Sequence, residues 1–451
     1  MTLDITKKVF ILCMIVTAFL LLFRLDAYLM DYDEGDLYLY PAMLVNSFGM
    51  HPYSDFTYTQ PPLLLYLFTS IYVGRLISVI SAFVLIGVVF LIGRKFGSGY
   101  YAAIFAAACP LVIIYGRLAV GDIPMLAMLS IVACITIYEY KSNFGMLGLG
   151  VAIFLAFMMK IQVIIPFGVL FFYLLVIRKE MPYIKALMVF VILFVVAEYI
   201  FPGMISETIF NNRPSIDINR SAVYIFTSIV NFVVKANILI IFGLYGAYKS
   251  LNRKERKFSI LYVLLLSCVL TAILYSWINY RHFMYIIPVL AIFAGVGLKG
   301  LKSNELAICV LVFSLFAPLT YWHKTTTYDS YTRDLGNMIF KAVPQGANIY
   351  SDQPMIAYMS KNMMPDTASL WNGMGRLRGL SVDDVIKDID RFNPEMVLIV
   401  VSTPDDMEQP RIISTFGKDG SDKLIEFLDK RYPKKDYYRR DYQLIRIWKY
   451  V

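Results

Sequence analysis

Four carboxylates crowd one short stretch near the start of the chain, MDYDEGDLYLYPAMLV. They are Asp31, Asp33, Glu34 and Asp36. Carboxylates this close repel each other and raise the pKa of one partner, which suits a general base. The same residues also fit a solvated turn before the helix predicted from Leu37, because acidic side chains favour helix N-termini. Spacing alone leaves both interpretations open, and they are compatible.

A further acidic residue falls in a turn between two apolar segments, YGRLAVGDIPMLAML. Arg117 and Asp122 lie in this turn, at residues 116–123. The spacing fits a simple helix start, with Asp122 as the N-cap and Pro124 in the first turn. Alternatively, Asp122 positions an acceptor or tunes a neighbouring base, and then it belongs to one site with the acidic loop.

Isolated cations border other apolar segments. Lys160 is the lone cation in LAFMMKIQVIIPF, and INYRHFMYIIPV begins with Tyr280, Arg281 and His282. Arginine offers a planar fork of donors that suits phosphate oxygens. Lys160 has a simpler alternative, since a lysine there can extend its ammonium to the membrane surface. Residues 203–235, with Arg213 and Arg220, are too polar for a clean span, and we expect an interfacial lid or acceptor-binding segment.

The chain that positions these groups is unusually apolar. It has 451 residues, of which 58% are hydrophobic and 17% charged, and its mean hydropathy is +0.62. These values exclude a disordered chain and an ordinary soluble enzyme. A transmembrane helix needs roughly 20 apolar residues, and about eleven segments meet or approach that length. The segments are 9–23, 76–92, 101–115, 124–138, 144–158, 161–177, 183–201, 236–248, 258–277, 283–298 and 306–322.

The net charge of +9 indicates orientation and does not indicate a nucleic-acid partner. Residues 325–451 carry 18 basic and 18 acidic residues, so the whole excess lies in residues 1–324. With the N-terminus in the cytoplasm, the inner loops carry about +10 and the outer segments about −1. The sequence therefore predicts a multi-pass protein of the cell membrane, with all candidate site residues at the outer face and an extracytoplasmic C-terminus.

The composition changes near Lys324 and divides the chain into two predicted domains. Residues 1–324 form a mostly α polytopic transmembrane bundle, in which the outer loops 26–62, 116–123 and 203–235 make the site. Residues 325–451 read as a soluble extracytoplasmic α/β domain. Its expected strands are 347–351, 396–402 and 442–449, and its expected helices are 382–392 and 422–430.

No metal and no cofactor are expected. The three histidines, His51, His282 and His323, are scattered, and all five cysteines fall in predicted spans. A transporter or flippase for a lipid-linked or anionic solute is the alternative function. It would place charges near the bilayer midplane and often show inverted repeats, whereas these charges lie at the membrane edge. A membrane-anchored binding protein would leave most of the spans unexplained.

An ordered set of segments resembles the polytopic glycosyltransferases of the GT-C fold. The set is YDEGD, QPPLLLYL, YGRLAVGDIPMLA, FLAFMMKIQVIIPF and YRHFMYIIPVLAIFAG. Within that fold the chain is most similar to the branch of protein O-mannosyltransferases and aminoarabinose-lipid A transferases. The resemblance covers most of residues 1–300 and implies sugar transfer, for which we expect an inverting mechanism that needs no metal because cations stabilise the departing phosphate. The donor would be a polyprenyl (dolichyl or undecaprenyl) monophosphate sugar, and the acceptor a hydroxyl of a protein, glycan or lipid on the outer face.

The resemblance also implies roles for single residues. Asp33 matches the family's base or acceptor-orienting carboxylate, with Glu34 beside it, and Asp122 matches the acid of the second outer loop. Lys160 and Arg281 match positions on the phosphate side of the donor. The neighbouring His282 and Tyr280 would lie on the same side.

Two positions depart from the family pattern. Lipid A-type members carry a lysine directly before the Pro-Pro pair, where this chain has Gln60, and an arginine soon after the acidic pair, where it has Asp36. Lys160, Arg117 and Arg281 would therefore supply the positive charge that binds the phosphate. The departures argue against aminoarabinose or lipid A specificity. They leave Asp36, Gln60, Arg213 and Arg220 as candidates lining the donor or acceptor pocket.

Overall fold

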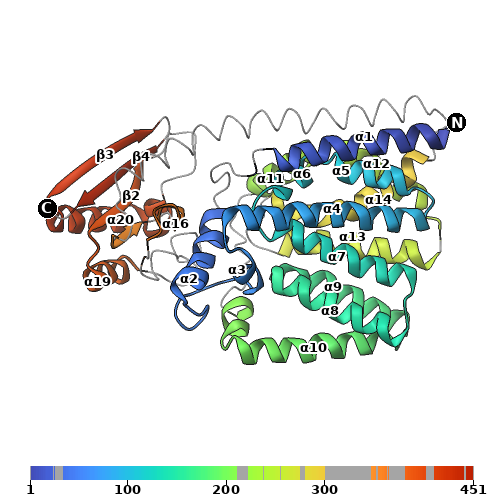
Figure 1. Ribbon diagram of the computed structural model, residues 1–451, viewed down its shortest axis with the longest axis horizontal. Coiled ribbons are helices and arrows are strands. Elements are labelled where there is room, and N and C mark those ends of the chain that lie inside the picture. Colours follow the sequence, from blue (N-terminus) through green and yellow to red (C-terminus); the bar gives the residue numbers. More distant parts are fainter. Residues whose placement is uncertain are drawn as a thin grey trace.

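The computed structural model describes residues 2–23, 25, 34–210, 222–236, 238–253, 255–274, 280–299, 347–351, 354–362, 364, 381–402, 411–440 and 443–449. These residues form a long helical bundle with a smaller part, which contains a β-sheet, at one end of it (Figure 1). We call this end, where α7 (Asp122–Tyr138) begins, the site end. The predicted span 306–322, the loop residues 26–33 and residues 211–221 lie outside the described residues.

Most of the longer helices of the bundle follow the predicted apolar segments within a few residues, whereas the first helix begins seven residues earlier than predicted and the helices at residues 40–48, 63–67 and 222–236 were not predicted as spans. In chain order they are α1 (Thr2–Leu22), η1 (Glu34–Leu39), α2 (Tyr40–Phe48), α3 (Leu63–Leu67), α4 (Ile71–Lys95), α5 (Gly99–Ala107), α6 (Pro110–Gly116), α7, α8 (Asn143–Met159), η2 (Ile161–Val163), α9 (Ile164–Phe172), η3 (Tyr173–Ile177), α10 (Tyr183–Ile200), η4 (Ser206–Phe210), α11 (Ala222–Ala236), α12 (Ile238–Ser250), α13 (Arg256–Leu274), η5 (Tyr280–Ile286) and α14 (Ile287–Lys299).

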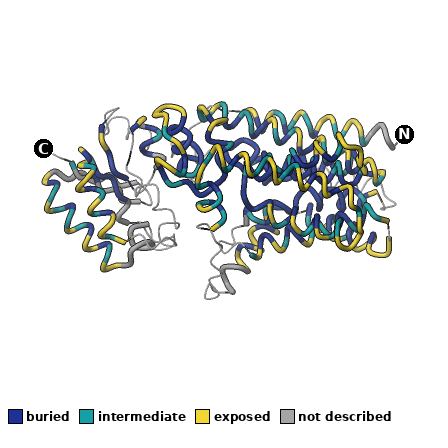
Figure 2. Tube along the Cα trace, turned by 90° about the horizontal axis from the view of Figure 1, so that it is seen from below, coloured by how far each residue is buried: buried dark blue, intermediate teal, exposed yellow. Residues whose placement is uncertain are grey.

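The apolar surface of the bundle requires an apolar solvent. In α10 only 17% of the spanning window is buried, and large apolar side chains such as Ile192 and Val195 are exposed along it. Figure 2 shows exposed residues, in yellow, along the outside of the bundle. In the span formed by η5 and α14, 83% of the window is buried. Within the described part of the chain, four helices are long and apolar enough to cross a bilayer, or up to six if each bent pair is one span. The total of about eleven spans stays a prediction.

Local sequence signals set several helix ends. Ser70 caps α4, because its hydroxyl accepts the Val73 N–H at 3.2 Å. The predicted segment 101–115 is divided into α5 and α6, which are bent by 59°. Pro110 opens α6 and has no N–H to continue the hydrogen-bond ladder of α5, so the chain turns there.

At the opposite end of the bundle, ion pairs join three helix ends. Arg256, at the start of α13, donates two hydrogen bonds to the Glu180 carboxylate at 2.8 and 2.9 Å. It also donates to the Thr136 carbonyl in the last turns of α7. Lys141 lies 3.0 Å from Glu180. Although partial burial opposes ionisation, the hydrogen bonds from Arg256 and Lys141 lower the pKa of Glu180 to about 2.

Glycines allow α12 and α14 to pack with their backbones in contact. A Cβ added at Gly246 would overlap the carbonyl oxygen of Phe293. A Cβ added at Gly297 would lie 3.0 Å from the Gly246 nitrogen. Small residues permit such close approach of helices in membranes, where packing rather than hydrophobicity drives their association.

The C-terminal part contains a four-stranded sheet of order β1-β2-β4-β3. Its elements are β1 (Ile349–Ser351), α16 (Pro354–Ser360), α19 (Val382–Phe392), β2 (Met396–Ser402), α20 (Arg411–Arg431), β3 (Lys434–Arg440) and β4 (Gln443–Lys449). β1 runs parallel to β2, while the β2–β4 and β3–β4 pairs are antiparallel, with Val397 opposite Trp448. The predicted helix 382–392 and strand 396–402 have these bounds, whereas β3 was not predicted and α20 is longer than expected.

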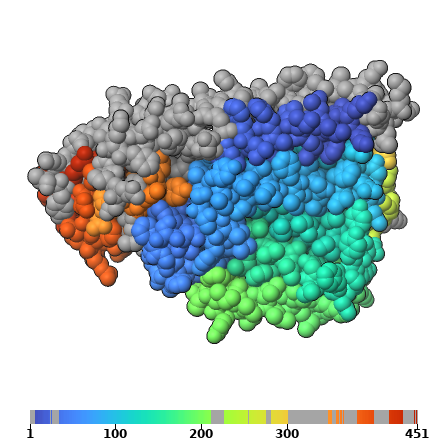
Figure 3. Space-filling view, viewed as in Figure 1, coloured from blue at the N-terminus to red at the C-terminus, as the bar shows by residue number. Residues whose placement is uncertain are grey.

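Helix α16 connects the C-terminal part to the site end of the bundle. The Tyr40 hydroxyl accepts the Met364 N–H at 2.9 Å, and the Tyr358 hydroxyl accepts the Ile71 N–H at 3.2 Å. In Figure 3 the surface of the first loop and α2, in blue, touches the orange surface of the C-terminal part. The C-terminal part therefore packs against the segment that follows the acidic loop.

Candidate active site

One buried carboxylate at the site end binds two buried cations. Lys160 Nζ lies 2.5 Å from Asp122 Oδ1, and Arg281 Nη2 lies 3.0 Å from Asp122 Oδ2. Asp122 is fully buried, and Lys160 and Arg281 are 7% and 8% exposed. His282 also interacts electrostatically with Asp122. The tertiary structure thus brings together three of the predicted site residues. Lys160 is 38 positions from Asp122 in the sequence, and Arg281 is 159 positions from it.

Three helix ends position this cluster. Asp122 is the first residue of α7, Lys160 follows the last residue of α8 in extended conformation, and Arg281 lies in the 3-10 turn η5. Gly121 allows them to meet, because a Cβ there would come within 2.8 Å of the Tyr38 hydroxyl and 3.0 Å of the Met159 carbonyl oxygen. Neighbouring groups therefore pack directly against the backbone of Gly121 and leave no room for a side chain there.

The cluster carries more positive than negative charge. Two cations share one carboxylate, which leaves one unit of positive charge in excess among the three side chains. The Arg281 guanidinium carbon also lies over the Tyr115 ring, 4.6 Å from the ring centroid, in a cation–π contact. Such a group of preorganised donors suits an anion that enters and takes over hydrogen bonds from the Asp122 carboxylate.

Glu34 takes part in a different buried ion pair. Its Oε1 accepts Arg75 Nε at 2.7 Å and its Oε2 accepts Arg75 Nη2 at 2.8 Å. The Ala119 N–H donates to Oε1 at 2.7 Å, and Arg75 Nη1 donates to the Leu25 carbonyl at 3.0 Å. Glu34 and Arg75 are 0% and 1% exposed. This pair ties η1 to α4 and to the turn before Asp122, so its geometry is that of a structural brace.

The other predicted residues are placed as follows. Arg117 is buried and donates to the Phe23 carbonyl at 2.6 Å, beyond the last residue of α1. Asp36 is buried in η1, and Gln60 is buried just before α3. For Tyr280 the structure describes the backbone, in η5. Asp33, Arg213 and Arg220 lie outside the described residues. Their roles stay predictions.

Three residues were missed by the sequence reasoning. Arg75 had a visible signal, since it is an isolated charge in the apolar run IYVGRLISVISAF. Gln162, which is 6% exposed, is likewise an isolated polar residue two positions after Lys160. Tyr115 had no signal of its own, because a tyrosine at the end of an apolar helix is common at a membrane interface.

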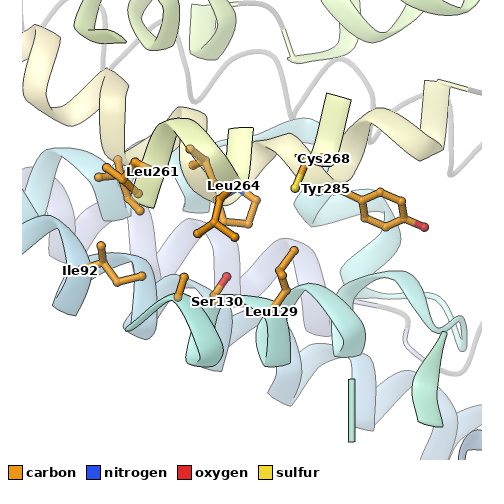
Figure 4. Close-up of a pocket in the computed structure, with 11 residues that line it drawn as sticks. Ile92, Leu129, Ser130, Leu261, Leu264, Cys268 and Tyr285 are labelled. Carbon is orange, nitrogen blue, oxygen red and sulfur yellow. The ribbon is translucent and has the colours of Figure 1, made fainter. Parts of the chain in front are cut away.

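An apolar pocket lies deeper in the bundle (Figure 4). It is lined by side chains of α4, α7, α13, η5 and α14, among them Leu129, Leu264 and Tyr285. It offers about 10 Å³ for the centre of a water-sized molecule, close to the least that one ordered water requires. The pocket is therefore too small for a lipid chain in this conformation.

Among the residues that the structure describes, no group of three or more His, Cys, Asp or Glu side chains is arranged to hold a metal ion. The expectation of a metal-independent site stays a prediction.

Comparisons with known proteins locate the fold. No family model and no curated protein sequence match the chain. Among solved structures, ArnT from Cupriavidus metallidurans bound to undecaprenyl phosphate matches with a TM-score of 0.68 and 16% identity, over 97% of each chain. ArnT from the same organism in the apo state matches with a TM-score of 0.65 and 14% identity, over 98% of this chain and 97% of that one.

The chain has the GT-C fold. A third structure extends the comparison: an oligosaccharyltransferase from Archaeoglobus fulgidus, in complex with zinc and sulfate, has a TM-score of 0.52 and 13% identity, over 86% of this chain and 67% of that one. The fold inferred from the ordered segments is therefore confirmed. At these identities the likeness establishes the fold and leaves the reaction to be argued from the site.

Proposed function

We propose that this GT-C protein is a membrane glycosyltransferase. It transfers a hexose or pentose from a polyprenyl monophosphate carrier to an acceptor hydroxyl of a glycan, protein or lipid at the outer face of the membrane. The observation that carries the proposal is the buried cluster in which Asp122 is shared by Lys160 and Arg281. The undecaprenyl phosphate bound to the ArnT structure supports the choice of carrier.

The cluster suits a phosphate that gains charge during the reaction. A phosphodiester carries one negative charge, and the polyprenyl phosphate that leaves carries up to two. Lys160 and Arg281 stabilise this increase because they are held in place before the reaction and are shielded from water. These cations supply the electrostatic stabilisation of the leaving group, so no step requires a metal.

The bonds and protons balance in one displacement. The acceptor oxygen forms a bond to the anomeric carbon from the face opposite the phosphate, the carbon–oxygen bond to the phosphate breaks, and the configuration inverts. The acceptor proton moves to a carboxylate, which the family resemblance assigns to Asp33. Asp122 then orients the cations, and Glu34 holds the loop that follows Asp33 through Arg75.

A transfer assay tests the proposal. Purified protein is incubated with radiolabelled undecaprenyl phosphate mannose, glucose or galactose and with a cell-envelope extract as the source of acceptors. We expect label to move from the lipid to an acceptor. The Asp33→Asn variant should lose about 10²- to 10⁴-fold in turnover, as expected for a missing base. Release of intact sugar lipid or free solute across vesicles, without transfer, would support a transporter instead.

The cations are tested separately from the base. Arg281→Met and Lys160→Met each remove charge-assisted hydrogen bonds, so the donor concentration for half-maximal rate should rise about 10- to 100-fold. The exposed Lys185, which hydrogen-bonds Asn143 far from the site, provides the control variant Lys185→Met. If the two site variants change only the dependence on acceptor concentration, the assignment of the cations to the donor phosphate is wrong.

The orientation of the chain is part of the proposal. We propose a cytoplasmic N-terminus and an extracytoplasmic C-terminal part, because the inner loops hold the basic excess. Cysteines introduced at exposed positions such as Lys418 in α20 should react with a membrane-impermeant maleimide in intact cells. Labelling only after permeabilisation would reverse the topology.

A further inference from the structure

Two buried glutamines near the cluster have side-chain oxygens without a hydrogen-bond partner. Gln60 and Gln162 are each 6% exposed. The Oε1 atom of each is fully buried and finds no donor among the described residues. An unpaired buried polar atom destabilises a protein by about 1–3 kcal/mol, and native structures keep few of them.

The contrast with Asn46 shows that this region can satisfy an amide. Asn46, in α2, donates from its side-chain nitrogen to the carbonyls of Ala42 at 2.8 Å and Leu65 at 2.7 Å. The latter carbonyl belongs to α3, which begins three residues after Gln60. The packing here therefore can satisfy a side-chain amide, yet it leaves the oxygens of Gln60 and Gln162 unpaired, together with the Tyr58 hydroxyl two residues before Gln60.

Both glutamines lie next to the residues that build the Asp122 cluster. Gln162 is in η2, two positions after Lys160. Gln60 precedes Pro61, Pro62 and α3, whose Leu64 side chain lies 3.0 Å from where a Cβ of Gly121 would be. The Met159 carbonyl lies at the same distance from that point. The start of α3, the end of α8 and the turn before Asp122 thus meet at one place.

The chemistry of an amide oxygen selects the kind of ligand group. An amide oxygen only accepts hydrogen bonds, and an ionised phosphodiester has no hydrogen to donate. The unpaired oxygens are therefore unsuited to the phosphate, which has Lys160 and Arg281 for partners. Sugar hydroxyls are donors, and in the donor lipid they belong to the sugar ring whose anomeric carbon is bonded to a phosphate oxygen.

We propose that Gln60 and Gln162 are specificity-determining residues that accept hydrogen bonds from hydroxyl groups of the donor sugar. The inference rests on the proposed function, since it assumes a sugar carried by a polyprenyl phosphate. The cluster then binds the phosphate, and the two amides recognise the sugar.

A binding experiment separates this inference from the proposed function. Purified full-length protein is titrated, by native mass spectrometry, with undecaprenyl phosphate and with undecaprenyl phosphate mannose, glucose and galactose. Wild type should bind at least one sugar lipid more tightly than undecaprenyl phosphate. Gln60→Met and Gln162→Met should each weaken binding of that sugar lipid about 3- to 10-fold and leave binding of undecaprenyl phosphate unchanged.

The outcomes are distinguishable. If wild type binds none of these lipids, the proposed function fails and the inference falls with it. The inference alone is overturned if wild type binds undecaprenyl phosphate but shows no preference for a sugar lipid. It is also overturned if Gln60→Met and Gln162→Met keep the full preference of wild type for the sugar lipid. Lys160→Met should weaken binding of all four lipids and so reports on the phosphate.

A stability measurement excludes a merely structural role. In ligand-free protein, Gln60→Met and Gln162→Met should leave Tm unchanged or raise it, because an unpaired buried amide is replaced by an apolar chain of similar length. Asn46→Leu is the matched control and should lower Tm, since it removes two hydrogen bonds. A fall in Tm for the glutamine variants as large as that of the control would show structural partners and overturn the inference.

Discussion

The Glu34–Arg75 pair gives a prediction that separates a structural carboxylate from a catalytic one. The pair is buried and makes two charge-assisted hydrogen bonds. In Arg75→Met the Glu34 carboxylate stays buried and loses both hydrogen bonds from the Arg75 guanidinium, while the Ala119 N–H still donates to it. Breaking a buried pair in this way destabilises a protein by about 3–5 kcal/mol. We therefore expect a clear fall in the stability of Arg75→Met.

Removing both charges should destabilise the protein less than removing one. In the double variant Glu34→Met, Arg75→Met no charge of the pair remains buried, and the loss comes from neighbouring groups such as the Ala119 N–H and the Leu25 carbonyl, which each lose a partner. At about 1 kcal/mol for each group, the double variant should lose about 2 kcal/mol. It should thus be more stable than Arg75→Met alone.

Thermal unfolding of the detergent-purified variants measures this cycle. Arg94→Met is the control on the same helix, because Arg94 is exposed and its loss should change stability by less than about 0.5 kcal/mol. If the effects of Glu34→Met and Arg75→Met simply add, the two groups are not coupled and the brace is refuted. If Glu34→Gln keeps wild-type Tm while transfer activity is lost, Glu34 is catalytic instead.

Three further predictions concern other parts of the molecule. Arg256 and its neighbours lower the pKa of Glu180 from 4.5 to about 2, so the ionised carboxylate stabilises the folded state above about pH 4.5. The difference in Tm between wild type and Glu180→Gln should therefore shrink as the pH falls from 4.5 toward 2. A constant difference would contradict this ion pair. Gly246→Ala should lower Tm because the added methyl group would overlap α14. Gly148→Ala, in α8, is the control and should not lower Tm, because no atom lies within 4 Å of the added methyl group. Equal effects would argue against close packing of α12 and α14. Tyr358→Phe should lower stability by about 0.5–1.5 kcal/mol and raise protease cleavage of the C-terminal part, while unchanged values would show that the contact of α16 with α4 does not hold the two parts together.

The elements of the bundle were largely predictable from sequence. Apolar runs gave most spans within a few residues, and Ser70 and Pro110 supplied local signals for a cap and a break. These features are legible because a helix satisfies its own backbone and its ends depend on a few neighbouring residues. β3 escaped prediction because its sequence, KKDYYRR, lacks the apolar alternation of a half-buried strand and its place is set by pairing with β4.

The residues of the site were predictable in kind but not in pairing. Asp122, Lys160 and Arg281 stood out as charges at the edges of apolar segments, and the structure joins them. Glu34 looked equivalent to its neighbour Asp33, yet packing sends its side chain to Arg75. The unpaired oxygens of Gln60 and Gln162 have no signature in sequence, because satisfaction of a polar atom depends on every group around it.

By itself, the sequence determined that the chain is apolar enough to live in a bilayer, and it predicted through its basic excess which end of each span faces the cytoplasm. Hydropathy and the distribution of basic residues are sums over many residues, and the hydrophobic effect is not directional. Both properties can therefore be calculated without knowing the positions of single side chains. Only the tertiary structure decided that one carboxylate is shared by two cations while a neighbouring acid braces the loop. Hydrogen bonds and ion pairs depend on distances of a few ångströms between residues far apart in the chain, and those distances exist only once the helices have packed.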